Sequence, residues 1–254
     1  MKKLFFMFST AILLQGCAST LKMEPQALDG QQEIFQEGIE SVISAKESLV
    51  AVRSSSKTYS SEHRPTFVIS VLNGTDTPFN FSTEDVKVYV DEIPHKVFTY
   101  DELVAEVKRK QAWAAVAAAL NGVSRSMNAA NAGYTYQSGT ANAYAYNNYG
   151  GSAYGTSTYS GYSYNAAAAQ QAQASANAQN QAEFKAVQTQ TEDSLNALSA
   201  TILKKTTVMP QARHGGYITI EKLDDINVNH ELKVIVTVSG EEHEFLFNHY
   251  KLQK

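Results

Sequence analysis

A long stretch without charged residues most constrains what this chain can fold into. Between Ser126 and Ala182 the sequence contains no Asp, Glu, Lys, Arg or His, and nine of its fourteen tyrosines lie within residues 134–164, among Gly, Ser, Asn and Thr. A segment with so few aliphatic residues lacks the apolar surface needed to build a core. A folded core must therefore come from the residues on either side of this uncharged tract.

Both flanking parts of the chain carry the signals of short β-strands. Their apolar runs are rich in β-branched and aromatic residues and are separated by turn-forming residues. These runs cover 48–53, 65–72, 79–81, 86–90, 97–100, 206–209, 217–220, 232–238 and 243–247. Eight or nine strands at this spacing predict a mainly β fold, an antiparallel β-sandwich built from residues 46–100 together with 203–254.

Residues 101–202, which interrupt the predicted sandwich, have helical periodicity at both ends. Asp101 is a suitable N-cap for the first helix. Apolar stripes recur at three- and four-residue intervals: Trp113, Val116, Leu120, Val123 and Met127, then Phe184, Val187, Thr191, Leu195, Leu198 and Ile202. Two stripes of comparable length predict an inserted antiparallel helical hairpin, in which the stripes pack together as a narrow, coiled-coil-like seam. Trp113 could face a partner, but packing in the seam is the favoured interpretation.

The far end of this hairpin is a low-complexity tip over residues 128–182. Its Ala, Gln and Asn run at 166–182 favours an extension of the second helix. The tyrosine-rich part is either disordered or weakly β-like and self-associating. The candidate interaction residues are Tyr134, Tyr136, Tyr144, Tyr146, Tyr149, Tyr154, Tyr159, Tyr162 and Tyr164. Tyrosines offer large, rigid contacts at low entropic cost, which favours a binding surface; a tolerated flexible expansion at a hairpin tip is the equal alternative.

The amino terminus has the pattern of a targeting segment. Two lysines precede an apolar run over residues 4–14, which is too short to span a bilayer, since spanning takes about 20 residues. Cys17, the only cysteine of the chain, directly follows the small residue Gly16. With Leu14 three positions before the cysteine, this segment resembles the lipobox of bacterial lipoproteins.

The lipobox resemblance implies a processing route and a location. In that family the signal is cut before the cysteine, here between Gly16 and Cys17, so residues 1–16 would be a signal peptide. The Cys17 thiol would carry a diacylglycerol, and the new amino terminus would take a further acyl chain such as palmitate. Several acyl chains make a stable anchor. Ala18 and Ser19 after the cysteine imply the outer membrane, facing the periplasm. Residues 17–45 are expected to form the lipidated N-terminus and a tether, with a short helix or a first strand near the end of the tether.

Two short motifs lie in the predicted sandwich. One is the strand–turn–strand run from Phe67 to Phe79, whose turn, residues 73–78 (NGTDTP), fits the pattern N-x-S/T-x-x-P. The other runs from Val208-Met209-Pro210 to Gly216-Tyr217-Ile218. Both resemble motifs of the small immunoglobulin-like domains, sometimes called telokin-like, of bacterial lipoproteins and secreted proteins. The resemblance implies an immunoglobulin-like antiparallel β-sandwich and brings no catalytic residues with it.

Charge and motif content indicate no nucleic-acid partner, no cofactor and no enzyme. Removing residues 1–16 takes two lysines from the 21 basic residues and none of the 25 acidic ones, so the net charge falls from −4 to −6, whereas nucleic-acid binders carry basic patches. Neither a metalloprotease HExxH, a CxxC, a Walker-type loop nor a GxSxG elbow is present. Glu241, His243 and His249 share a face of a predicted strand, where a metal site is conceivable, but surface or turn histidines are the favoured interpretation.

These features favour a non-enzymatic, lipid-anchored envelope protein. It would act as a structural or assembly module through its helical hairpin and tyrosine-rich tip, with the membrane and another protein, or a second copy of itself, as partners. An accessory lipoprotein that holds a ligand or glycan in its sandwich loops or tip is the alternative. A weaker third possibility is an enzyme whose histidines and carboxylates do not group in the sequence.

Overall fold

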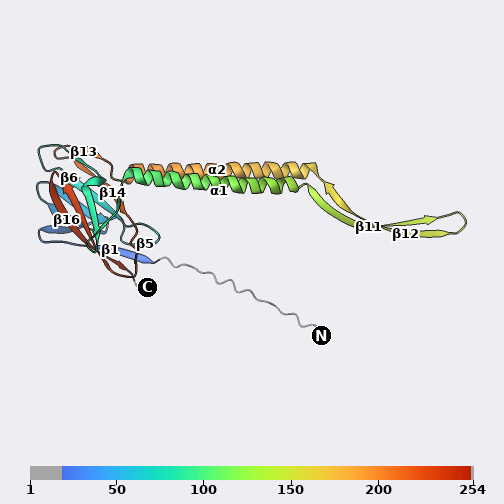
Figure 1. Cartoon of the computed structure of the whole chain (residues 1–254), viewed down its shortest axis with the longest axis horizontal. Helices are drawn as coiled ribbons and strands as arrows, with labels where there is room; N and C mark the ends of the chain where they lie inside the picture. The colour runs from blue at the N-terminus through green and yellow to red at the C-terminus, as the bar shows by residue number, and fades with distance from the viewer. Residues whose placement is uncertain (1–18, 253–254) are drawn as a thin grey trace, which may run out of the picture. The chain divides into compact units, whose positions relative to one another are not determined.

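The computed structural model describes residues 19–252, which form two compact units (Figure 1). The two-sheet unit contains residues 19–103 together with 198–252, and the helical unit contains residues 104–197. Gly16 and Cys17 lie outside the described residues. Among the helices of the described part, none has both the length and the apolar character needed to cross a bilayer.

Two six-stranded antiparallel sheets make up the two-sheet unit. The first has the order β5 (Tyr59–Ser60), β1 (Thr20–Gln26), β16 (Glu241–Lys251), β15 (His230–Val238), β8 (Val86–Val90) and β9 (Ile93–His95). The second has the order β10 (Val97–Phe98), β14 (Arg213–Ile220), β6 (Thr66–Leu72), β4 (Leu49–Ser54), β3 (Ile39–Ala45) and β2 (Gln31–Gln36). A short pair, β13 (Thr206–Val208) with β7 (Phe79–Phe81), and the 3-10 turn η1 (Thr83–Asp85) complete the unit.

Alternating burial along the strands directs one face of each sheet into a shared core. In β6 every second residue, Phe67, Ile69 and Val71, is fully buried, while the residues between them stay partly exposed. Side chains of both sheets belong to one hydrophobic cluster. The rings of Phe67 and Phe247, one from each sheet, meet edge to face with their centroids 5.0 Å apart. The strands predicted in 46–100 and 203–254 are confirmed, and they surround this core.

Residues 19–45 are not the tether that the sequence predicted, although the strand expected as one possibility near its end is present as β3. They form β1, β2 and β3, and β1 lies inside the first sheet between β5 and β16. Leu21 and Met23 of β1 are only 2% and 4% exposed. The physical reason is that isolated apolar residues alternating with polar ones are the pattern of a strand with one buried face. That pattern is weak in a single short segment, and the neighbouring strands β5 and β16 supply the missing backbone hydrogen bonds.

The turn at Asn73 joins the two parts of the chain that the helical unit separates. The buried Asn73 side-chain amide donates hydrogen bonds to the carbonyl oxygens of Thr77 and Val208, at 2.9 and 3.0 Å. Its Oδ1 accepts from the backbone N–H and the hydroxyl of Thr75. At the next position a Cβ would lie 1.9 Å from the Glu47 carbonyl oxygen, so Gly74 alone allows this close approach.

Two long helices and a long hairpin occupy the chain between β10 and β13. Helix α1 spans Tyr100–Asn131 and α2 spans Ala166–Thr201, with strands β11 (Tyr134–Tyr146) and β12 (Ser152–Tyr164) between them. The N-cap of α1 is Thr99 rather than the predicted Asp101. The Glu102 N–H donates to the Thr99 hydroxyl, while the Thr99 N–H donates to the Glu102 carboxylate. This reciprocal capping box satisfies two backbone groups at once, which Asp101, inside the first turn, does not do.

The chain therefore has a mixed α/β fold and not the mainly β fold that was predicted. Its strands account for 45% of the residues that the structure describes, and the two antiparallel six-stranded sheets are accompanied by two long helices that pack on each other. Both the antiparallel sheets and the helix pair were expected from the sequence. The Ala-, Gln- and Asn-rich run at 166–182 is helical throughout, as expected, and the two helices of 32 and 36 residues make up too large a part of the described chain for a mainly β class.

Candidate functional site

Small side chains hold the two helices of the helical unit together. Ala118 of α1 and Ala176 of α2 are 2% and 6% exposed, and Ala129 and Ala169 are buried in the same way. A Cβ added to Gly122 would come within 3.2 Å of the Asn180 side-chain amide. Helices that meet through alanine and glycine can approach more closely than helices that meet through large side chains. The helix seam is therefore an alanine seam.

A polar cluster crosses this seam within the last three turns of α1. The Arg125 guanidinium donates to the Asn180 side-chain oxygen at 3.0 Å and to the Glu183 carboxylate. Asn121 also donates to Glu183, at 3.1 Å. The hydrogen bond from Arg125, followed by the one from Asn121, holds the pKa of Glu183 below its ordinary value. These bonds join residues of α1 to residues of α2 in antiparallel order, so they set the register of the two helices.

The apolar stripe of α1 is not part of the seam. Its residues Trp113, Val116, Leu120, Val123 and Met127 are between 51% and 75% exposed. At about 100° per residue, the stripe lies on the side of the helix opposite to Ala118, Gly122 and Ala129. The prediction that the stripe packs against the second helix is therefore wrong. The alanine face of α1 has the same three- and four-residue spacing and permits closer packing, so it takes the seam.

The apolar residues predicted on the second helix divide between the seam and the surface. Thr191 is buried and Val187 is half-buried in the seam, whereas Phe184 is 40% exposed. Thr191 also satisfies its hydroxyl locally by donating to the Val187 carbonyl oxygen at 2.7 Å. The two helices therefore do not contribute equally to the exposed apolar surface. Helix α1 presents a continuous apolar row to solvent, whereas α2 presents only the ring of Phe184.

The tyrosine-rich tract forms a regular antiparallel hairpin of two 13-residue strands, β11 and β12. Its closing turn is organised by Asn147, whose side-chain oxygen accepts from the backbone N–H groups of Tyr149 and Gly151. Gly150 has a φ of +81°, a left-handed conformation that favours glycine. Of the two alternatives left open by the sequence, disorder or β-structure, the structure has the second.

Cross-strand pairing gathers most of the tyrosines on one face of this hairpin. Three pairs stack across the strands, with ring centroids 4.8–5.3 Å apart: Tyr134 with Tyr164, Tyr136 with Tyr162, and Tyr144 with Tyr154. Tyr146 shares their face because side chains alternate along a strand. We call these seven residues the tyrosine face. Tyr159 projects from the opposite face, opposite Gly139, and Tyr149 lies in the turn.

The hairpin leaves its tyrosines exposed and both of its strand edges unpaired within the described residues. Its nine tyrosines are 57–97% exposed, and within residues 19–252 no third strand pairs with β11 or β12. A two-stranded hairpin is only marginally stable in water unless further strands or a packed face support it. Uncharged, unpaired strand edges of this length are also templates for pairing with another chain. The tyrosine face and the two edges are thus the strongest candidate interaction surface of the tip.

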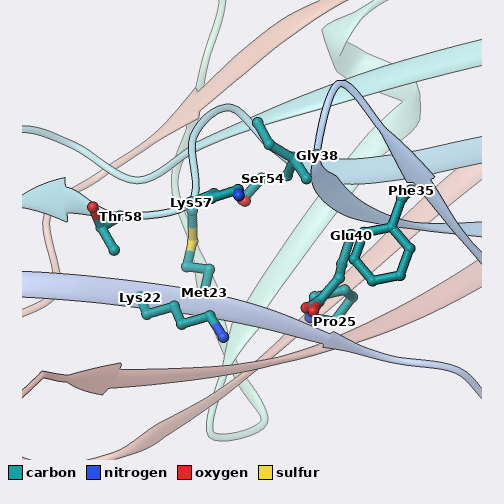
Figure 2. A pocket seen from close by; sticks show the side chains of 10 residues that line it. Lys22, Met23, Pro25, Phe35, Gly38, Glu40, Ser54, Lys57 and Thr58 are labelled. Atoms are coloured by element: carbon teal, nitrogen blue, oxygen red, sulfur yellow. The ribbon is translucent and has the colours of Figure 1, made fainter.

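The two-sheet unit has a separate open cavity of about 340 Å³ (Figure 2). Its side chains come from β1, from the β2–β3 hairpin and from the end of β4 with the following loop. Two lysines, Lys22 and Lys57, line it together with Phe35, which is 74% exposed. Lys22 is already hydrogen-bonded to Glu24 at 2.8 Å. The cavity therefore offers one aromatic surface and one lysine, Lys57, that has no acidic partner within residues 19–252.

Two histidines that the sequence placed on the surface are buried in the structure. His243 and His249 of β16 are both 0% exposed. The alternation His243, Phe245, Phe247, His249 is the pattern of a core face, and it is the signal in the sequence that indicates their burial. His243 Nδ1 lies 3.0 Å from the Ser44 hydroxyl, and His249 Nε2 lies 2.8 Å from the Tyr59 hydroxyl. Neither histidine belongs to a metal-ligand cluster, since within residues 19–252 no three His, Cys, Asp or Glu side chains lie close enough together to hold a metal ion.

Burial sets the protonation of these histidines. Desolvation, with a smaller contribution from the charge of His230, lowers the pKa of His249 to about 4. Desolvation and the nearby Lys46 also lower the pKa of His243, against the opposing effect of Glu241. His230 is the exception: burial by itself lowers its pKa, but hydrogen bonds to the Asp91 carboxylate and to the Asp225 carbonyl raise it above its ordinary value. The two buried imidazoles are therefore neutral at pH 7.

The chain was compared with protein-family models, curated proteins and solved structures. No protein-family model, no curated protein and no solved structure matches the chain.

Proposed function

We propose that this chain is a non-enzymatic, lipid-anchored assembly module of a bacterial cell envelope, and that it acts through its helical hairpin and its tyrosine face. The observation that carries the proposal is the β11–β12 hairpin. It aligns seven tyrosines on one face, it has no charged residue, and both its edges are unpaired in the described part of the chain. Such a surface is suited to contact with another protein surface.

The proposed anchor rests on the amino-terminal sequence. The lysines, the apolar run, Gly16 and Cys17 follow the lipobox pattern in order. We place the two-sheet unit among immunoglobulin-like domains, as the Asn73 turn suggests. Its two antiparallel sheets and the hydrogen bonds of Asn73 to Thr77 and Val208 are compatible with that assignment. In this arrangement the lipid holds the chain at the outer membrane, and the hairpin supplies the contact.

The proposal predicts that the tyrosine face forms a contact in intact cells. A photo-crosslinking residue at position 146 of the full chain should give a higher-mass adduct. Combined Tyr136→Ser, Tyr144→Ser, Tyr154→Ser and Tyr162→Ser substitutions should reduce that adduct roughly tenfold, because buried tyrosines dominate contact energies. The measurement is the adduct fraction on a denaturing gel.

The matched control changes the opposite face of the same hairpin. Thr135→Ala and Ser157→Ala, which alter residues pointing away from the tyrosine face, should leave the adduct unchanged. A Cys17→Ser chain should lose both its membrane association and the adduct, since it cannot be lipidated. An adduct that persists in the fourfold serine variant, or that is absent from the unmodified chain, would contradict the proposal.

A second candidate function rests on the cavity of Figure 2. Lys57, Phe35 and the open volume of about 340 Å³ are suited to a sugar ring stacked on an aromatic side chain, with a hydrogen bond from the ammonium group. An accessory glycan-binding lipoprotein would show a rise in melting temperature with cell-wall fragments. Phe35→Ala should abolish that rise, and Ile93→Ala, at another exposed apolar residue, should not. No shift at millimolar fragment would exclude this function.

A further inference from the structure

The outward stripe of α1 is a second surface that the described chain leaves uncovered. Five large apolar side chains stand at positions 113, 116, 120, 123 and 127, each at least 51% exposed. The corresponding outward face of α2 carries Lys185, Thr189 and Glu192 and is polar. A continuous row of exposed apolar side chains is therefore confined to α1, whereas α2 exposes the single ring of Phe184.

The spacing of the stripe is that of a coiled-coil seam. Its intervals of three, four, three and four residues place all five side chains in one narrow row along about 21 Å of helix. The inner face of α1 already packs through Ala118, Gly122 and Ala129, so the outer row cannot be satisfied by α2. Without a second helix against it, this apolar row stays exposed to water. Another helix that carries an apolar row with the same spacing would cover it.

We propose that this stripe docks the same stripe of a second copy of the chain, with the two α1 helices antiparallel. The inference rests on the proposed assembly function and names its partner. Leu120 of one copy packs against Val123 of the other, and Val116 packs against Met127. In this register Trp113 lies over Ala130, so a large side chain meets a small one. The paired segment is residues 112–131, about 30 Å of helix, which ends where α1 ends.

Charge favours the antiparallel arrangement. A basic cluster, Lys108, Arg109 and Lys110, lies one turn before the stripe. A parallel pair would bring the two clusters side by side. In the antiparallel register each cluster lies beyond the end of the partner's α1, and the residues that follow that end up to Ala182 carry no charge. The two clusters are about 37 Å apart along the helix axis, well beyond the screening length of about 8 Å at physiological salt. Within 112–131 the only charged residue is Arg125, which is bound to Glu183 in the inner seam.

The area is sufficient for a specific dimer. At 51–75% exposure, the five side chains present on the order of 600 Å² per copy, which is at the upper end of the range for the largest apolar patch on a monomer. Two such patches bury roughly 1,200 Å² together, above the threshold of about 1,000 Å² for a specific interface.

Sedimentation of the mature chain, residues 17–254 with Cys17→Ser, tests the partner. The chain should be a dimer at tens of micromolar, and Leu120→Glu should raise the dissociation constant at least about a hundredfold, because each dimer loses two buried leucines and gains two charges. Ala178→Glu adds the same charge on the outward face of α2 and should leave the dimer intact. Circular dichroism checks that both variants stay helical. A monomeric parent chain, or a dimer unaffected by Leu120→Glu, would overturn the inference.

Disulfide trapping tests the direction. Cys17 is the only cysteine, so the Cys17→Ser background contains no other thiol. Val116→Cys chains mixed with Met127→Cys chains should give a covalent dimer on oxidation, and neither variant alone should. Efficient trapping of either variant with itself would mean a parallel pair and would contradict the proposal.

Vesicle binding separates this inference from its nearest competitor and from the proposed function. The competitor is a stripe that binds the membrane. If the chain stays monomeric, co-floats with phosphatidylethanolamine–phosphatidylglycerol vesicles, and loses this vesicle binding in Leu120→Glu, the stripe faces a membrane and the inference is overturned. If Leu120→Glu removes no dimer while the position-146 adduct persists, only the stripe proposal fails. If the dimer forms and that adduct is absent, only the proposed role of the tyrosine face fails.

Discussion

Replacing Phe247 by alanine is expected to lower the free energy of unfolding of the two-sheet unit by about 3–5 kcal/mol. Phe247 is fully buried on β16, which lies inside the first sheet between β1 and β15. Its ring meets Phe67 of the second sheet edge to face at 5.0 Å. The substitution removes apolar area and leaves a cavity between two sheets that cannot close on it, because strands on both sides hold β16 in place.

Urea denaturation of the chain, monitored by far-ultraviolet circular dichroism, measures this loss as a shift of the transition midpoint. Phe35→Ala is the matched control, since the same ring is removed from a side chain that is 74% exposed, and it should change stability by less than about 1 kcal/mol. Equal effects of the two substitutions would mean that the core does not join the two sheets at Phe247.

Acidification from pH 7 to pH 4 is expected to cost the two-sheet unit up to about 3 kcal/mol through His249 alone. The folded pKa of His249 is lowered to about 4, whereas the unfolded value is about 6.5. Below pH 6.5 the unfolded chain therefore binds a proton that the folded chain does not bind, and the stability falls until the pH reaches the folded pKa. His243, whose pKa is also lowered, acts in the same direction.

The surroundings of His249 explain why its pKa is lowered, and the neighbouring His230 partly offsets the loss of stability at low pH. The Tyr59 hydroxyl is its only hydrogen-bonding side chain, and Nδ1 has no protein partner in the described part of the chain. The ring of His230, with centroid 6.0 Å away, is held by Asp91. Because the pKa of His230 is raised, its contribution has the opposite sign: it is present below pH 6.5 and is lost as the pH rises through the folded pKa.

The measurement is the urea midpoint between pH 7 and pH 4.5, where the lowered carboxyl pKa values contribute little. The parent chain should lose stability steadily over this window. His249→Gln, which keeps a hydrogen-bonding group for Tyr59 but binds no proton, should have a clearly shallower dependence even if its stability at pH 7 is lower. An identical dependence in the variant would show that His249 is not the responsible group.

Local patterns in the sequence predicted much of the fold correctly. Strands such as 65–72 and 232–238 follow from alternating β-branched and aromatic residues, and both were found with one buried face. The helices follow from three- and four-residue spacing. The first two strands were missed, because β1 carries only isolated apolar residues and its place between β5 and β16 depends on partners far away in the chain.

The candidate site was predicted in its composition but not in its arrangement. The nine tyrosines were identified, yet their distribution over one face depends on the register that pairs Tyr134 with Tyr164. A shift of one residue would have moved half of the side chains to the other face. The two core histidines show the reverse case: the alternation with Phe245 and Phe247 was present in the sequence, and it indicated burial where a surface position had been favoured.

The sequence by itself determined where most of the strands, the two helices and the uncharged tract lie, because those depend on short-range periodicity and composition. Only the tertiary structure decided which of the two spaced faces of α1 meets α2. Ala118, Gly122 and Ala129 form one face and Trp113, Leu120 and Met127 the other, and both have the spacing of a helical seam. The choice depends on how closely two backbones can approach, which is a property of the pair of helices. Hence the large apolar side chains were left on the outside of α1.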